Sequence, residues 1–133
     1  CMASSFQTNP YSVGYVSHEV TSFASNFKAY SSGYPPTLQR HGPLVVLVGA
    51  VANTAAFSPS DDKITLFTAP IGFRPAIVTR TLCQGSGKNS WLLEAMTNGN
   101  VTISRYGTTA YGTVGVNTWI VCAAVWMTDD PLP

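Results

Sequence analysis

Apolar and polar side chains alternate over short intervals through the central part of the chain, from Ile64 to Gly107. A period of two is typical of β-strands. Each interval is rich in Val, Ile, Thr, Leu or aromatic residues and is bounded by Gly, Pro, Asn or Ser, as strands commonly are. The pattern therefore predicts strands at Lys63–Thr68, Ala76–Gln84, Asn89–Met96 and Asn100–Arg105.

Asn98 and Gly99 are expected to close a hairpin between the last two of these strands. A two-residue turn would mix apolar and polar side chains on both faces of the hairpin. A three-residue loop, with Gly99 in the left-handed conformation, shifts the pairing by one residue and separates the two kinds of side chain. We predict this second register, in which the following residues share the apolar face: Trp91, Leu93, Ala95, Val101, Ile103 and Arg105.

Two further segments, Leu44–Val51 and Trp119–Met127, are apolar at nearly every position. A strand of this kind buries one face in the core and the other against something else, for which another subunit is the expectation. Thr37–Arg40 is predicted to pair with the first of these segments. Between Pro70 and Pro75 the chain is expected to turn a corner, because both prolines fix φ and lack an N–H donor.

The N-terminal part of the chain is polar and aperiodic. Residues 1–26 are interpreted as a tag remnant, a linker or an N-terminal arm, and residues 27–133 as the folded head. Val20, Phe23, Ala24 and Phe27 have the spacing of one short helix. Their Ser, Thr and β-branched neighbours favour an extended edge segment equally well, so both alternatives stay open at this point.

The composition favours one small all-β domain. Nine prolines and eleven glycines separate short strand patterns in 133 residues, as in antiparallel sandwiches and barrels. We predict a small antiparallel β-barrel or jelly-roll-like head. Charged residues are 10% and hydrophobic residues 45% of the chain. So few charges cover a small monomer poorly, and we expect identical subunits to bury part of the surface.

Several classes of function are disfavoured by the residues present. The net charge is +1 and the basic residues are scattered, which gives no nucleic-acid surface, and the longest apolar run is too short to cross a bilayer. Neither His18 nor His41 has metal-ligand spacing to a cysteine or an acid. Glu94 has no second carboxylate for glycosidase chemistry. We therefore expect no enzyme activity and no catalytic residue, cofactor or metal. The cysteines are expected to be buried free thiols.

Binding of a saccharide suits the residues of the hairpin better. Sugars are recognised by aromatic faces, with amides, arginines and carboxylates bonding to the hydroxyl groups. The candidate saccharide-binding residues are Trp91, Arg105, Tyr106, Glu94, Asn89 and Lys88. The alternative is that Trp91 caps the core with Arg105 stacked on it, and both interpretations stay open. Trp119 is expected in the core or at a subunit contact.

Six segments resemble, in their order and spacing, the C-terminal heads of phage tail and baseplate proteins. They are Asn26–Tyr30, Pro36–Gly42, Val45–Gly49, Ala69–Pro75 with Gly99–Ser104, and Trp119-Ile120. The resemblance covers most of the chain, from Phe27 to Thr128. It is a resemblance to the receptor-binding proteins of tailed phages that infect Gram-positive bacteria, such as lactococcal and streptococcal phages. Ala69 and Phe27 depart from it, standing where Leu and Trp are usual.

The resemblance implies a homotrimeric β-barrel head at the distal end of the virion tail, assembled in the host cytoplasm alongside other tail and baseplate proteins. Such heads bind host cell-wall polysaccharide without cleaving it and do not insert into membranes. Their binding residues vary with the host, so the resemblance assigns no ligand contact. The alternatives are a structural trimerisation or protein-binding module of the tail tip and, third, a polysaccharide depolymerase.

Overall fold

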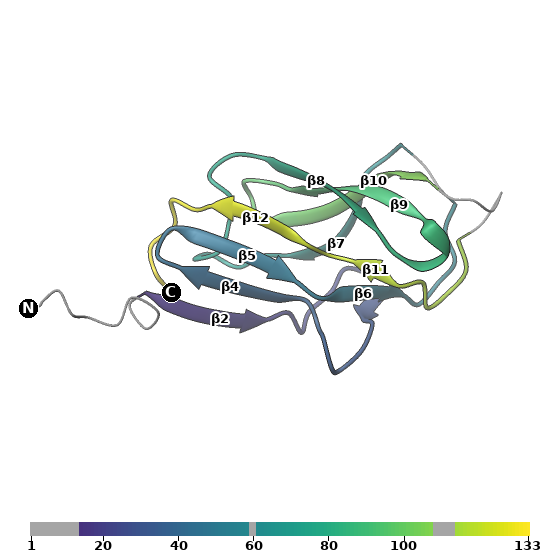
Figure 1. The fold of residues 1–133 in the computed structure, drawn as a ribbon, viewed down its shortest axis with the longest axis horizontal. Coiled ribbons are helices and arrows are strands. Elements are labelled where there is room, and N and C mark those ends of the chain that lie inside the picture. Colours follow the sequence, from purple (N-terminus) through teal and green to yellow (C-terminus); the bar gives the residue numbers. More distant parts are fainter. Residues whose placement is uncertain (1–13, 59–60, 108–113) are drawn as a thin grey trace, which may run out of the picture.

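The computed structural model describes residues 14–58, 61–107 and 114–133, and this part of the chain is all-β with antiparallel sheets (Figure 1). The 3₁₀ turn η1 (Ser86–Lys88) joins two of the strands. The strands are β2 (Tyr15–Glu19), β3 (Phe27–Ala29), β4 (Thr37–His41), β5 (Leu44–Val48), β6 (Ala50–Asn53), β7 (Ile64–Thr68), β8 (Thr79–Gln84), β9 (Ser90–Ala95), β10 (Asn100–Gly107), β11 (Ile120–Val121) and β12 (Ala124–Met127).

The sheets form two facing layers (Figure 1). One layer is the four-stranded sheet β7-β10-β9-β8. The other combines the four-stranded sheet β12-β5-β4-β2 with the three-stranded sheet β11-β6-β3. Side chains from both layers meet in one apolar core, represented by Leu38 and Leu47 on one side and Leu93 and Ile103 on the other. Burial of these faces is the main force that holds the layers together.

The prediction of an antiparallel all-β chain is confirmed, whereas no sheet within the described ranges closes into a barrel. The edge strands β8 and β12 lie next to each other. No ladder joins them, and single contacts link the strands or the residues beside them, such as the bond from Ala76 N, before β8, to Met127 O at 2.8 Å and the contact from Cys83 Sγ to Ala123 O, before β12, at 3.6 Å. The sheets therefore stay open along this edge.

The predicted strand Leu44–Val51 is interrupted at Gly49, which separates β5 from β6. Gly49 has a φ of 111°, which is strained for any residue with a side chain. A Cβ at this position would lie 2.4 Å from the carbonyl oxygen of Pro35. The strand that pairs with this segment is interrupted opposite Gly49, between β11 and β12, where Cys122 N donates to Gly49 O at 2.9 Å.

The pairing keeps one register across this break. Ala124 pairs with Leu47 before it, and Ile120 pairs with Val51 after it, so the residue numbers of both pairs add up to the same value. The two interrupted strands therefore form one bent ribbon. Its inward residues enter the core, and its outward residues stay apolar along the whole length, as the sequence predicted for both segments.

The hairpin of β9 and β10 has the predicted three-residue loop. Met96 N donates to Asn100 O and Gly99 N donates to Met96 O, both at 2.8 Å, and Gly99 has a φ of 96°. Leu93 pairs with Ile103, which is the predicted register. The predicted apolar face lies in the core at each position except the last.

That exception, Arg105, is exposed. The pairing with β9 shifts between Ser104 and Gly107, and Arg105 has a φ of 50° at this point. A bulge of this kind places one extra residue on one strand and exchanges the faces beyond it. Tyr106 therefore takes the inward position that we predicted for Arg105.

The predicted boundary between arm and head is wrong, because the fold already includes residues before 27. β2 pairs with β4 from Tyr15 opposite His41 to Glu19 opposite Thr37, and Val20 lies in the core. Residues 1–13 of the expected arm lie outside the described residues. Of the two alternatives for the segment from Val20 onward, the short helix is not found, and residues 20–26 form no strand before β3 begins at Phe27.

A buried arginine ties the C-terminal tail to the body of the fold. Arg40 is 6% exposed and donates to four carbonyl oxygens. Its Nε bonds to Gly42 O at 2.7 Å, and Nη1 bonds to Gly72 O at 2.7 Å and Pro131 O at 3.0 Å. Nη2 bonds to Asp130 O at 2.7 Å. Carbonyl dipoles thus solvate the buried charge.

The Asp130 side chain completes this arrangement, which we call the C-terminal clamp (Arg40, Gly72, Arg74, Asp130 and Pro131). Asp130 Oδ2 accepts from Gly72 N at 2.9 Å and Arg74 N at 3.0 Å, and Oδ1 accepts from Arg74 Nη2 at 2.9 Å. The hydrogen bond from Arg74 is the largest cause that holds the pKa of Asp130 well below its usual range, and the two backbone N–H groups act in the same direction.

We predict that Asp130→Asn lowers the melting temperature at neutral pH. Because the folded-state pKa of Asp130 is lowered, its stabilising effect is present above the ordinary aspartate pKa, about 4, and is lost as the pH falls below it. The difference in Tm between wild type and variant should therefore shrink on acidification. Asp129→Asn, at an exposed neighbour, is the control and should change Tm little. A Tm difference that is the same at every pH would contradict the assignment.

Candidate functional site

Three partly exposed aromatic side chains from different segments gather at one place on the surface. Tyr30, Tyr34 and Trp119 are 39%, 46% and 39% exposed. The ring centroids of Tyr30 and Tyr34 are 6.1 Å apart, with 27° between the ring planes. The centroids of Tyr30 and Trp119 are 6.5 Å apart, with 48° between the planes. We call these three residues the aromatic platform.

The middle strand of the three-stranded sheet explains why the rings can meet. In β6, Val51 lies in the core and pairs with Ala29 of β3. Its neighbours Ala50 and Ala52 therefore point to the outer face. Tyr30 N continues the ladder by donating to Ala50 O at 3.0 Å. Methyl groups on the middle strand are small enough to leave room above them for larger side chains, and both alanines are buried.

Trp119 is held through its backbone, which leaves its ring partly free. Its N–H donates to Ser86 Oγ at 2.9 Å, and its carbonyl accepts from Ser86 N at 3.3 Å. The preceding residue, Thr118, donates its N–H to Asn53 Oδ1 at 2.9 Å. Asn53 is fully buried, and its amide also bonds to Gly115 O at 2.7 Å. A buried amide thus fixes the loop that carries the tryptophan.

Tyr34 lies in a short loop that is also fixed by hydrogen bonds. Its N–H donates to Ser31 O at 3.3 Å, and its carbonyl accepts from Ala50 N at 3.2 Å. Gly33 N donates to Ser31 Oγ at 3.1 Å. Two prolines follow Tyr34 and stiffen the loop. A ligand that binds here would therefore have little loop entropy to remove.

This arrangement is suited to binding. Partly exposed aromatic rings offer apolar faces to the C–H side of a sugar ring. Within the described residues, no group of three His, Cys, Asp or Glu side chains could hold a metal ion. The histidines have aromatic neighbours: His18 lies 5.7 Å from Phe73 and His41 lies 4.6 Å from Tyr15, ring to ring.

Cys83 and Cys122 are buried free thiols, as predicted for both. Burial raises the pKa of the Cys83 thiol and, more strongly, that of the Cys122 thiol. A raised pKa keeps a thiol protonated at neutral pH, and the protonated form is a poor nucleophile. These cysteines therefore serve the core.

The structure places two of the predicted saccharide-binding residues in the interior. Trp91 has 0% exposure and stacks on Tyr106 with 5.5 Å between the centroids and 15° between the planes. Trp91 Nε1 donates to Val121 O at 3.2 Å. Burial raises the pKa of Tyr106, and the nearby Asn89 amide opposes this more weakly. Neither ring offers a face to a ligand, so we assign Trp91 to the core, as the alternative interpretation had it.

Glu94 is also unsuited to direct contact with a sugar, because it is 3% exposed. Its carboxylate lies between Arg80 Nε at 2.7 Å and Lys63 Nζ at 3.8 Å, and Ser104 Oγ donates to it at 3.4 Å. These contacts satisfy the buried charge. Arg105 is exposed but is turned away from the Trp91 face by the bulge, so the predicted cluster is divided.

Lys88 and Asn89 have a different environment, since they belong to the connector that touches Trp119. Lys88 is exposed and Asn89 is half-buried. Ser86 of the same connector makes both backbone contacts to Trp119. Lys88 and Asn89 thus follow, by two and three residues, the serine that contacts the platform tryptophan.

None of the three platform residues is among the six residues predicted to bind a saccharide. Trp119 was expected in the core or at a subunit contact because its segment is apolar throughout. Tyr30 and Tyr34 stand at the ends of a Ser-Ser-Gly stretch. The sequence feature that could have indicated the platform is the pair of tyrosines in a polar loop, because loops lie on the surface. The meeting with Trp119 depends on strand pairing over a long sequence distance, which local pattern does not reveal.

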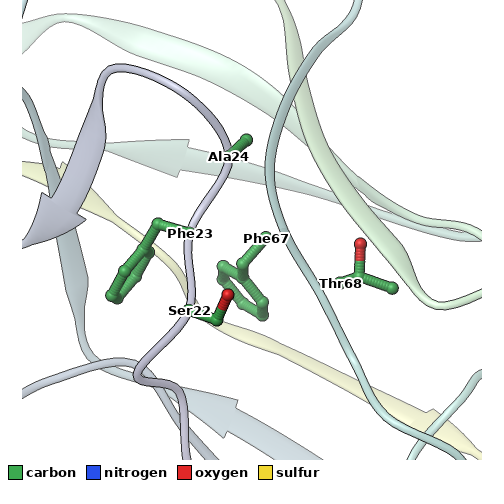
Figure 2. A pocket seen from close by; sticks show the side chains of 5 residues that line it. All are labelled: Ser22, Phe23, Ala24, Phe67 and Thr68. Atoms are coloured by element: carbon green, nitrogen blue, oxygen red, sulfur yellow. The ribbon is translucent and has the colours of Figure 1, made fainter.

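A separate shallow depression of about 210 Å³ lies between the segment after β2 and strand β7 (Figure 2). It is lined by Ser22, Phe23, Ala24, Phe67 and Thr68. Phe23 and Phe67 meet edge to face, with 6.3 Å between the ring centroids. Phe67 is 1% exposed, so the depression offers a ligand less aromatic surface than the platform does.

No protein-family model matches this sequence, and the search of curated proteins found no match. Within the described residues, no helix is both long and apolar enough to span a membrane.

We predict that Trp91→Ala destabilises the fold by about 3–5 kcal/mol, the usual cost of removing a buried large aromatic side chain. Denaturant titration of the free energy of unfolding measures this. Leu82→Ala is the control, because Leu82 is 76% exposed and its truncation should cost little. A small loss for Trp91→Ala would show that its ring is not part of the tightly packed core.

Proposed function

We propose that this chain is the non-enzymatic, jelly-roll-like head of a phage receptor-binding protein, which attaches the virion to the wall polysaccharide of a Gram-positive host. The single observation that carries saccharide binding is the aromatic platform, formed by Tyr30, Tyr34 and Trp119. The phage assignment comes from the sequence resemblance. The partly exposed rings of the platform, on a loop and a strand end held by hydrogen bonds, support a binding function.

The carboxylates support a binding head more than a depolymerase. Glycoside hydrolysis needs two carboxyl groups that face one cleft, separated by several ångströms. Glu94 is buried between Arg80 and Lys63, and Asp130 is held by Arg74. Asp129 is exposed and follows strand β12, far along the ribbon from Trp119. The printed partners of Glu94 and Asp130 all lie outside the aromatic platform.

We predict that Trp119→Ala and Tyr34→Ala each weaken binding to purified, protease-treated wall polysaccharide by roughly 5-fold or more, because each removes a stacking face. Tyr15→Ala is the matched control, since Tyr15 is 44% exposed and lies on β2, outside the platform. Binding is measured on folded protein by calorimetry, and the supernatant is checked for released oligosaccharide.

Unchanged binding by both platform variants would contradict the proposed site. Released oligosaccharide would contradict the non-enzymatic function. Binding only to walls that still carry protein would favour a protein-binding module of the tail tip.

Self-association, proposed here as a homotrimer, is supported by the outer face of the ribbon of β5 and β12. Four apolar side chains are exposed on this face: Leu44 (36%), Val48 (40%), Val125 (53%) and Met127 (54%). Val46 lies between Leu44 and Val48 on the same face and pairs with Val125. We call these five residues the apolar stripe. They carry no charge, so identical copies could cover them without burying an unpaired ion. A shallow depression adjoins the stripe at Met127 and is otherwise lined by Ala76, Ile77 and Thr79.

We predict that Val125→Glu converts the native oligomer to monomers while the isolated subunit keeps its melting temperature within a few degrees. A charge at this position would be buried unpaired in the contact between subunits. Light scattering after size exclusion gives the oligomeric state. Val116→Glu is the matched control, since Val116 is 55% exposed and lies in a loop outside the apolar stripe. A wild-type monomer, or an unchanged mass for Val125→Glu, would contradict this arrangement.

A further inference from the structure

The open edge between β8 and the ribbon of β11 and β12, which we call the seam, is crossed by isolated bonds instead of a ladder. At one end, Ala76 N donates to Met127 O at 2.8 Å. Further along, the indole of Trp91 reaches across from β9 and donates to Val121 O at 3.2 Å. Strand edges without a ladder are places where a fold opens easily. A covalent link across the seam would restrain this opening directly.

The two described cysteines stand opposite each other across the seam. The residues before β8 bond to the end of β12, and Ser86, after β8, donates its N–H to Trp119 O at 3.3 Å, so the two edges run in opposite directions. Three residues back from Ser86 is Cys83, and three residues on from Trp119 is Cys122. Cys83 Sγ lies 3.6 Å from the carbonyl oxygen of Ala123, the residue after Cys122. Both cysteine side chains enter the same core.

The electrostatics of the two thiols agree with this placement. Burial is the largest cause that raises the pKa of Cys122, and the Cys83 thiol adds to it. One thiol has such an effect on another only at short range. Because the pKa of Cys83 is raised by burial as well, few thiolates form at neutral pH, and the pair stays reduced until an oxidant is supplied.

We infer that Cys83 and Cys122 form a redox modification site, at which a small-molecule disulfide oxidises the two thiols to an internal disulfide across the seam. The Cys83 thiolate, which is less deeply buried, attacks one sulfur of the oxidant, whose S–S bond breaks and releases one thiolate. The Cys122 thiolate then attacks the Cys83 sulfur, forms the new S–S bond and releases the second thiolate. Two cysteines are oxidised, and the oxidant is reduced to two thiols, which take up the two cysteine protons.

This disulfide would join the two layers of the fold, because β8 belongs to one layer and the ribbon to the other. The loop that it closes contains the whole hairpin of β9 and β10. Closing a loop of this length removes conformational freedom from the unfolded chain, so the oxidised protein should melt roughly 5–15 °C higher than the reduced protein. The inference is independent of the proposed function, since neither thiol belongs to the aromatic platform.

The test uses oxidised glutathione as the oxidant, on protein in which Cys1→Ser leaves Cys83 and Cys122 as the remaining cysteines. One sample is oxidised in the folded state. A second is unfolded and then refolded in a glutathione redox buffer, so that burial of the thiols cannot block the reaction. We expect an intact mass lower by two hydrogen atoms, a peptide that links Cys83 to Cys122, and the raised Tm. A dithiol reductant should restore the original mass and Tm.

Two single variants are the controls. In Cys122→Ala and in Cys83→Ser the oxidant should form no internal bond and should not raise the Tm. A bond that forms on refolding and raises the Tm supports the inference even where the folded sample reacts slowly. The inference is overturned if the refolded protein keeps both thiols free, carries glutathione on Cys83 or forms disulfide-linked dimers. An internal disulfide that lowers the Tm would also overturn it, because the native positions of the two cysteines would then not accommodate the bond.

Discussion

The position of the C-terminal tail depends on one buried cation. The Arg40 guanidinium is surrounded by carbonyl oxygens from three segments, at residues 42, 72 and 130–131. Removing one partner of a buried, bonded charge commonly costs about 3–5 kcal/mol, so the tail, the 70–75 corner and the β4–β5 turn are fixed together. Asp130 adds a second connection to the same corner through Arg74. These contacts close one end of the two-layer fold.

The clamp also gives a physical meaning to two of the segments that carry the resemblance. Arg40 and Gly42 belong to the Pro36–Gly42 segment, and Gly72 and Arg74 belong to the Ala69–Pro75 segment. They meet in the clamp. Gly72 has a φ of 108°, which favours glycine, and a Cβ there would also crowd the Pro133 ring at 3.0 Å. The residue pattern of these segments is thus explained by folding, without any ligand.

The sequence was informative wherever a local pattern determines structure. The alternation of side chains and Gly99 together fixed the β9–β10 register, because a slip by one residue would have put the apolar face in water. The pattern did not reveal the bulge at Arg105, which exchanged Arg105 and Tyr106, or the break at Gly49, which is imposed by the distant Pro35 carbonyl. The start of the fold was misplaced because the pairing of β2 is with a strand some twenty residues later.

Local sequence patterns were also insufficient to locate the candidate site. Trp91 and Trp119 look alike as sequence features, each in an apolar strand pattern. Their difference arises from their surroundings: Trp91 is fully buried and stacks on Tyr106, whereas Trp119 is 39% exposed and lies beside Tyr30. In Figure 1, the C-terminus and β11 lie toward opposite ends of the molecule. The clamp fixes one end of the ribbon, and at the other end the backbone is rigid while the rings stay exposed. Side chains at that end could therefore be substituted without disturbing the interaction on which the fold depends.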